Sequence, residues 1–362
     1  MEDIKKTCLY SRHLALNAKM SPFAGFDMPI QYSGIPQEHN SVRNSAGIFD
    51  VSHMGQIRVT GLEAGAFVNY IFTNDTIAIP EGKIVYGMML YPDGGTIDDL
   101  LVYKEHNNSY FLVINAANID KDLAWIMANK QGYNVNIENL SDYFGLVAIQ
   151  GPDSEKIIES VMDIRVGDLK YYTFKTIDFK GYEIIISRTG YTGEDGFEIY
   201  GSEEFTKIIW DLFIDSGRVT PCGLGCRDTL RFEAGLPLYG HELSQTITPI
   251  MAGLSMFVKF NKNNFIGKEA LVKEKEKGPA KKIVGIVLLE KSVPRAGYTV
   301  QSRGRDIGYV TTGYISISTG KPICMALIDS SMSQPGTNVE IIIRNKIFPA
   351  IVTQRGNWKK RT

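Results

Sequence analysis

The sequence predicts an α+β protein in which two successive α+β units are followed by a small all-β barrel. Two observations support this fold class. Strand-like and helical segments follow one another in the same order twice within residues 55–213, and six short strand-like runs separated by turn residues occupy residues 283–352. The chain has 362 residues, 44% of them hydrophobic, which is enough to fill the cores of two or three domains.

The first unit is expected to contain a strand, a helix, three strands, a second helix and a last strand. Period-two alternation of apolar residues predicts the strands, and apolar residues three and four apart predict the helices. In chain order these segments are residues 55–60, 62–71, 84–91, 96–103, 110–115, 119–127 and 134–137.

The second unit repeats this order as far as its second helix. Pro152 is expected in the first turn of the first of these helices, where its missing N–H leaves no bond unmade. Two units of the same order indicate an internal duplication, each unit being an antiparallel sheet with helices on one side. The segments are residues 144–149, 157–162, 171–178, 182–188, 197–200 and 205–213.

The last part of the chain reads as a linker and a barrel. The charged run Lys273–Pro279 predicts a solvated linker, because its charges alternate and Gly278 and Pro279 end it. Short strands with turn residues between them then predict a β-barrel. They are residues 283–289, 298–302, 306–310, 323–328, 339–344 and 347–352.

Composition excludes several classes of protein. The net charge is −1, so there is no electrostatic footprint for nucleic acid or an anionic membrane, and no apolar run approaches membrane-spanning length. The four cysteines form no C-x-x-C pair and the five histidines no H-E-x-x-H, so neither a disulfide framework nor a metal site is expected. Residues 1–6 lead into no apolar segment, so we expect a cytoplasmic protein.

Two adjacent carboxylates stand within an otherwise apolar strand. Alternate side chains of a strand share a face, so Asp99 lies with Leu101 and Tyr103, whereas Asp98 lies with Leu100. Burying a charge costs free energy unless an opposite charge or hydrogen bonds compensate for the lost water, so a buried charge is retained where it is paired or has a functional role. A lone aspartate here would be a structural partner of the preceding glycine turn, but two adjacent acids favour a functional group.

A second candidate carboxylate follows a glycine-rich loop at residues 190–196. The three loop glycines are spaced as if to hold a phosphate, but Glu194 and Asp195 would repel one, and there is no phosphate-binding loop motif. A plain connection between strands is the alternative. Glu198 interrupts the apolar strand that follows, and a carboxylate facing a pocket can accept two parallel hydrogen bonds from an amidine-like edge such as that of a pterin or guanine.

A helix is expected to begin in the segment 221–233. Arg227 and Arg231 are four residues apart and share one face, either as functional cations or as surface ion pairs with Asp228 and Glu233. The segment holds only half of a dinucleotide-binding fingerprint, and no G-x-S-x-G motif of a serine hydrolase occurs in the chain.

Taken together, these segments resemble the T protein of the glycine cleavage system, an aminomethyltransferase that uses tetrahydrofolate. The matching segments run through almost all of the first 250 residues in the order of the family. They are residues 49–55, 73–75, 94–100, 115–118, 150–152, 188–198, 222–233 and 239–240.

The resemblance implies two ferredoxin-like or related α+β domains around a central folate cleft, with a C-terminal β-barrel domain. The expected bounds are 1–50 with 141–250 for a discontinuous folate-binding domain, 51–140 for the domain that carries Asp98 and Asp99, 251–280 for a linker region and 281–362 for the barrel. Two departures from the family pattern, at residues 314–319 and 353–358, lie in the barrel.

The implied activity is transfer of an aminomethyl carbon from the dihydrolipoyl arm of H protein to tetrahydrofolate, a step of glycine catabolism and one-carbon metabolism. Its products are 5,10-methylenetetrahydrofolate, ammonia and reduced H protein. The alternatives are a tetrahydrofolate-dependent demethylase of another small methylated substrate and a non-catalytic folate-binding protein.

The resemblance also implies roles for particular residues. Asp99 is the expected catalytic carboxylate. Glu198 is expected to bind the edge of the pterin, Tyr191 to pack on the pterin ring and Arg227 to close the same pocket. Arg227 as a structural partner of Glu198 is the alternative. The neighbouring folate-binding positions are Met54, Tyr86, Tyr103 and Asn115, and a basic patch for H protein is expected among Lys281, Lys282, Arg355, Lys359, Lys360 and Arg361.

Overall fold

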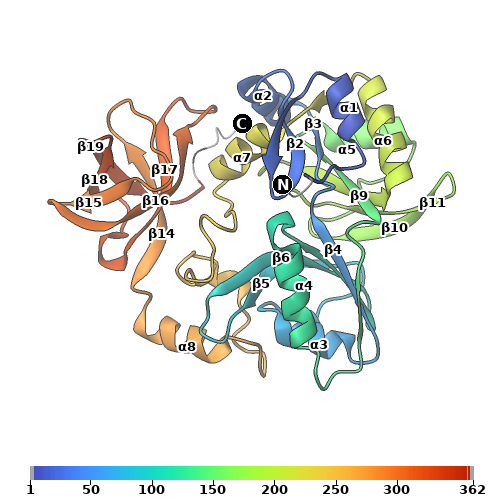
Figure 1. The fold of residues 1–362 in the computed structure, drawn as a ribbon, viewed down its shortest axis with the longest axis horizontal. Coiled ribbons are helices and arrows are strands. Elements are labelled where there is room, and N and C mark those ends of the chain that lie inside the picture. The colour runs from blue at the N-terminus through green and yellow to red at the C-terminus, as the bar shows by residue number, and fades with distance from the viewer. Residues whose placement is uncertain (1–3, 357, 359–362) are drawn as a thin grey trace. The chain divides into compact units, whose positions relative to one another are not determined.

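The computed structural model describes residues 4–356 and 358 (Figure 1). The chain forms two compact units. Unit 1 comprises the described residues of the ranges 1–87 and 100–230, and unit 2 those of 88–99 and 231–362. These bounds differ from the domain bounds expected above, which stay a prediction. Within the part of the chain that the structure describes, no helix is long and apolar enough to cross a membrane.

The first predicted α+β unit forms a five-stranded sheet in the order β5-β6-β7-β4-β8. Helix α3 packs against β4 and β7, and it begins after Leu62, whose side chain is exposed. The elements are β4 (Gly55–Thr60), α3 (Ala64–Ile71), β5 (Ile84–Leu90), β6 (Thr96–His106), β7 (Ser109–Ile114), η1 (Ala116–Asn118), α4 (Ile119–Ala128) and β8 (Asn136–Asn139).

The second predicted α+β repeat, which lies in unit 1, forms a six-stranded sheet in the order β10-β11-β12-β9-β3-β13. Helices α5 and α6 both pack against β9 and β12. The order β10-β11-β12-β9 corresponds to β5-β6-β7-β4 of the first sheet, so the predicted repeat is confirmed in topology. The elements are β3 (Gly47–Asp50), β9 (Phe144–Gln150), α5 (Ser154–Met162), β10 (Phe174–Phe179), β11 (Tyr182–Ser187), β12 (Gly196–Ser202), α6 (Glu203–Asp215) and β13 (Thr220–Pro221).

The first 46 residues carry elements that the sequence patterns did not predict. A hairpin turns at Ala24 and Gly25, both with positive φ, and Pro36 stands in the first turn of α2. Prolines at positions 22, 29 and 36 interrupt the periodicity that would have marked these short segments. The elements are α1 (Tyr10–Ala15), β1 (Lys19–Phe23), β2 (Phe26–Gln31) and α2 (Ile35–Asn44).

Strand β12 separates two apolar cores in unit 1. Phe197 and Ile199 pack into the core that also contains buried residues of α5 and α6. Tyr200 belongs to the other core, which includes Tyr103 and Phe111 of the five-stranded sheet. Because side chains of a strand alternate between its faces, Glu198 lies on the same face as Tyr200.

Unit 2 contains the predicted barrel, closed by pairing of β14 with both β17 and β19. Helix α7 (Leu224–Glu233) begins in unit 1, and its last three residues belong to unit 2. The remaining elements are η2 (Ser255–Phe257), α8 (Lys268–Lys277), β14 (Lys281–Leu288), β15 (Thr299–Ser302), β16 (Arg305–Ile315), β17 (Pro322–Asp329), η3 (Ser330–Met332), β18 (Asn338–Ile343) and β19 (Lys346–Thr353).

The expected linker at Lys273–Pro279 is wrong in its first five residues, which form the last part of α8. Lysine and glutamate are good helix formers, and buried Leu271 anchors the helix. Gly278, with a positive φ of 80°, ends it. The charges of this run are mostly exposed, as expected, but on a helix.

Candidate active site

Glu198 is a buried carboxylate at the centre of a polar cluster in unit 1. Its side chain is 7% exposed. Burial raises its pKa, whereas hydrogen bonds from Thr189 and Tyr200 and the positive charge of Arg227 oppose this rise. A carboxylate held in this way is a strong acceptor for a ligand that brings its own N–H donors.

A series of hydroxyl groups leads from Glu198 into the core between the two sheets. Thr189 Oγ1 donates to Glu198 Oε2 at 2.5 Å and lies 2.7 Å from Ser187 Oγ. Ser187 Oγ lies 3.2 Å from the hydroxyl of Tyr103, which lies 2.8 Å from the hydroxyl of Tyr200. We call Thr189, Ser187, Tyr103 and Tyr200 the hydroxyl chain.

Tyr103 is expected from the resemblance to line the folate site, and this role stays a prediction. Its side chain is fully buried, and burial raises its pKa above the ordinary value. The ring packs edge-on against Phe111 and Tyr200 rather than presenting a face to solvent. Tyr103 connects to Glu198 through the hydroxyl chain. Its aromatic neighbours from both sheets impose this burial.

Arg227, on helix α7, is a buried cation directed at the same cluster. Its guanidinium carbon lies 4.8 Å from the centre of the Tyr191 ring, a cation–π contact. Burial lowers its pKa, and the charge of Glu198 opposes this effect. Within the described residues, no ion pair shorter than 4.0 Å joins Arg227 to Glu198, and Arg227 Nη1 is buried without a hydrogen-bond partner. A buried donor of this kind favours a ligand contact over a purely structural pairing with Glu198.

His53 and Met54 follow strand β3, and His53 lies close enough to Arg227 for that charge to affect its pKa. His53 is 3% exposed, and its Nδ1 has no hydrogen-bond partner in the described structure. Burial lowers its pKa to about 4, and nearby Arg227 also lowers it, whereas Asp50 opposes the shift. Met54 is partly buried against the core that contains Tyr103. The sequence marked His53 only as part of a family motif, and a lone histidine carries no pattern that would single it out.

The loop that carries Tyr191 is fixed by Gln150. Gln150 Nε2 donates to the Thr189 carbonyl at 3.0 Å, and Thr192 Oγ1 donates to Gln150 Oε1 at 2.9 Å. A Cβ atom at Gly190 would lie 1.9 Å from Gln150 Oε1, so a larger residue there would displace Gln150 from these hydrogen bonds. This loop glycine therefore makes room for Gln150, and the phosphate interpretation gains no support.

The turn before the two aspartates is held by a distant segment of unit 2. Gly95 N donates to Asp93 Oδ1 at 3.0 Å, and a Cβ atom at Gly95 would lie 2.0 Å from the Gln245 carbonyl oxygen. Thr96 donates through its amide to the Ser244 carbonyl at 3.0 Å, which aligns the start of β6. Turn and strand are thus fixed by packing that only glycine permits.

Asp98 and Asp99 differ in exposure on β6. Asp98 is fully buried, whereas Asp99 is partly exposed, as is Leu101 on the same face. Asp99, the expected catalytic residue, is the one that a ligand can reach more easily.

The other sequence-predicted positions are Tyr86 and Asn115. Tyr86, on β5, is partly buried, and its carbonyl accepts a hydrogen bond from Asn74 Nδ2 at 2.8 Å. Asn115 is partly buried and immediately precedes η1. Their role in lining a folate site stays a prediction.

The basic residues expected to contact H protein are only partly described. Lys281 and Lys282 begin strand β14, and Lys282 is exposed. Arg355 donates to the Ala252 carbonyl at 2.7 Å, so part of its guanidinium is already bound within unit 2. Lys359, Lys360 and Arg361 lie outside the described residues. The docking surface therefore stays a prediction.

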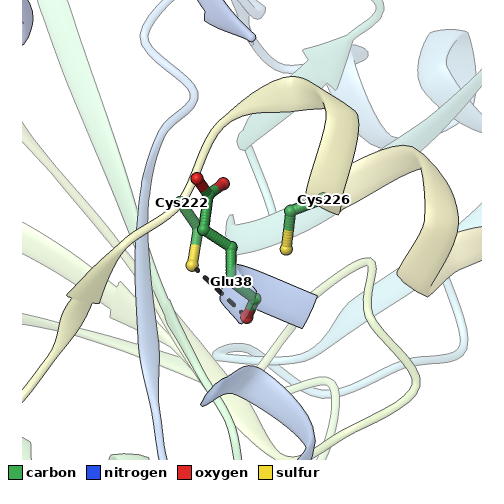
Figure 2. Close-up of side chains that lie close together, drawn as sticks. All are labelled: Glu38, Cys222 and Cys226. Atoms are coloured by element: carbon green, nitrogen blue, oxygen red, sulfur yellow. Dashed lines mark hydrogen bonds between the residues drawn. The ribbon is translucent and has the colours of Figure 1, made fainter. Parts of the chain in front are cut away.

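Glu38, Cys222 and Cys226 form the one group of described residues whose ligand atoms are close enough for a metal ion, within 4.8 Å of one another (Figure 2). The Glu38 carboxylate already accepts the N–H groups of Tyr32 at 2.6 Å and Gly223 at 2.9 Å. The Cys222 thiol is directed at the Glu38 carbonyl at 3.8 Å, and burial raises its pKa, which disfavours the thiolate that a metal requires. These contacts give the group a structural role, because they link α2 to the residues just before α7.

Comparisons with known proteins place this fold and site in one class of transferases. The family described as GCVT N-terminal domain matches residues 9–262, and the glycine cleavage T-protein C-terminal barrel domain matches residues 281–358. The chain is similar to the aminomethyltransferase of Caldanaerobacter subterraneus subsp. tengcongensis, with 49% identity over 99% of this chain and 97% of the relative. The aminomethyltransferase of Alkaliphilus oremlandii is 48% identical over the full length of both chains.

A solved structure agrees with these relatives. The glycine cleavage system aminomethyltransferase T from Bartonella henselae superposes with a TM-score of 0.94, at 30% identity over 99% of each chain. The chain belongs to the glycine cleavage T-protein family. The expectation of an aminomethyltransferase is confirmed over that of a demethylase or a non-catalytic binding protein. The family is folate-dependent in general.

Proposed function

We propose that this chain transfers the methylene carbon of an aminomethyl group from the lipoyl arm of an H protein to tetrahydrofolate. One C–S bond and one C–N bond of the donor break, and two C–N bonds to the folate form. The two N–H hydrogens lost by tetrahydrofolate leave with the lipoyl thiol and with ammonia. The products are 5,10-methylenetetrahydrofolate, ammonia and dihydrolipoyl H protein.

The observation that carries the folate assignment is the cluster of Glu198 and Arg227. Glu198 is a buried acceptor, and Arg227 Nη1 is a buried donor without a partner in the described structure. The 2-amino and N3 hydrogens of a pterin supply two parallel donors for the carboxylate, and the adjoining 4-oxo oxygen is an acceptor suited to a guanidinium. Tyr191 then packs on the ring, and Met54, Tyr86, Tyr103 and Asn115 line the neighbouring surface.

Asp99 is the proposed catalytic carboxylate. Positive charge develops on nitrogen as the aminomethyl carbon changes partners, and a fixed anion stabilises that charge. The same carboxylate can orient or deprotonate the attacking nitrogen. The partial exposure of Asp99, against the full burial of Asp98, supports this choice between the two acids.

The test is turnover of tetrahydrofolate with aminomethylated H protein, read as methylenetetrahydrofolate formed. Asp99→Asn keeps the shape of the side chain and removes its charge, so turnover should fall by roughly 10²-fold or more while folate still binds. Asp98→Asn is the matched control and should cost less. Equal and small losses in both variants would contradict the assignment. Failure of the wild-type protein to use aminomethylated H protein would contradict the proposed donor.

A further inference from the structure

The hydroxyl chain behind Glu198 is closed off from solvent along its whole length. Ser187, Tyr103 and Tyr200 are fully buried, and Thr189 is 6% exposed. Four hydroxyl groups from three strands and a loop do not meet in an apolar core without partners, because each buried hydroxyl needs a hydrogen bond. Here they satisfy one another and end at a single carboxylate.

When Glu198 is ionised, it determines which group of the hydroxyl chain donates and which accepts in the hydrogen bonds nearest to it. A carboxylate only accepts, so the Thr189 hydroxyl uses its one proton on Glu198 Oε2. Thr189 Oγ1 can then only accept at its contact with Ser187, so Ser187 donates to it. Tyr103 has one proton, for which the oxygens of Ser187 at 3.2 Å and of Tyr200 at 2.8 Å are alternative acceptors. Bonds aligned in this way strengthen one another.

A protonated Glu198 fits this arrangement poorly. Its carboxyl O–H would need an acceptor where Thr189 and Tyr200 both donate. The titratable groups that face Glu198 are Arg227 from α7, Tyr103 from β6, Tyr172 from the segment before β10, and Tyr200 on its own strand. Among these only Arg227 carries a charge near neutral pH, and it also favours the carboxylate.

We propose that Thr189 is a positioning residue which, with the hydroxyl chain behind it, keeps Glu198 ionised and turned toward the pterin. This inference rests on the proposed folate function. Thr189 occupies Oε2, so the carboxylate rotation is fixed and its remaining acceptor capacity is available to the two pterin donors. The Thr189 backbone is held separately by Gln150, so replacing the side chain does not release the loop.

The experiment compares Thr189→Val, which has nearly the same shape without the hydroxyl, with Thr189→Ser, which keeps it. The dissociation constant of tetrahydrofolate is measured by calorimetry for the full-length protein between pH 5 and 8. We expect Thr189→Val to weaken binding at pH 7 by roughly tenfold, and to move the pH below which affinity falls upward by about one unit, because a donor to the charged form is lost. Thr189→Ser should keep the wild-type profile.

Two further variants separate the possible failures. Tyr103→Phe removes a hydroxyl further along the chain and should shift the pH profile in the same direction by a smaller amount. Unchanged binding in Thr189→Val, or a loss that is independent of pH and not rescued by serine, would overturn the positioning role. Unchanged affinity in Glu198→Gln would instead refute the pterin contact itself, whatever the behaviour of Thr189.

Discussion

His53 is a buried histidine whose substitution should change the acid stability of this protein. Its ring is 3% exposed and packs against the edges of Phe23 and Phe26, at centroid distances of 5.7 and 6.3 Å. The folded protein therefore holds a neutral imidazole. We expect His53→Asn to lose much of the stability change that the wild-type protein undergoes below pH 6.5.

The magnitude follows from the pKa of the imidazole in the two states. Burial lowers the pKa of His53 from 6.5 to about 4. Between these values the unfolded chain binds a proton that the folded chain excludes, so folding stability falls as the pH is lowered from 6.5 to 4. The contribution is about 2 kcal/mol at pH 5 and about 3 kcal/mol at pH 4.

The assay is urea denaturation of the wild-type protein and of His53→Asn at half-unit steps from pH 4 to 8. The difference between the two free energies of unfolding should change by about 3 kcal/mol over this range, in favour of the variant at low pH. His106→Asn is the control, because the His106 ring is exposed and its loss removes no burial cost. Parallel profiles for the wild type and His53→Asn would refute the reasoning.

Two further predictions test buried charges. Glu198→Gln should weaken tetrahydrofolate binding by roughly tenfold or more, because a neutral amide replaces the charged acceptor of the pterin N–H groups; unchanged affinity would count against this. Arg231→Met should lower the free energy of unfolding by about 3–5 kcal/mol in urea, because Glu242, bonded to Arg231 at 2.9 Å and fully buried, loses its countercharge. The double variant Arg231→Met with Glu242→Leu should recover much of this loss, and a single-variant loss below about 1 kcal/mol would contradict the argument.

Several elements of the fold followed from local patterns. The strands and helices between residues 55 and 215 were predicted in the right order, because apolar side chains with a period of two or of 3.6 mark which face of an element is buried. The barrel strands were predicted for the same reason. The N-terminal elements before residue 47 were missed, because their short segments are interrupted by prolines and lack a sustained period. Helix α8 was taken for a linker because exposed charges are common to both.

The candidate site was predictable in part. Glu198 stood out because a carboxylate interrupts an apolar strand, and the resemblance to the T-protein family pointed to Asp99, Tyr191 and Arg227. Nothing in the pattern distinguished Thr189 and Ser187, since serine and threonine are common in loops and at strand ends. The burial of Tyr103 was not foreseen either, because alternation along a strand tells which residues share a face but not what covers that face.

The sequence by itself determined which elements form, since that depends on residues a few positions apart. It also determined the family, through motifs that keep their order along the chain. Only the tertiary structure decided that Tyr103 and Tyr200, 97 residues apart, share a hydrogen bond, and that Thr189 completes a path of hydroxyls to Glu198. Such contacts depend on how two sheets pack against each other, and no local pattern encodes the distance between residues brought together in that way.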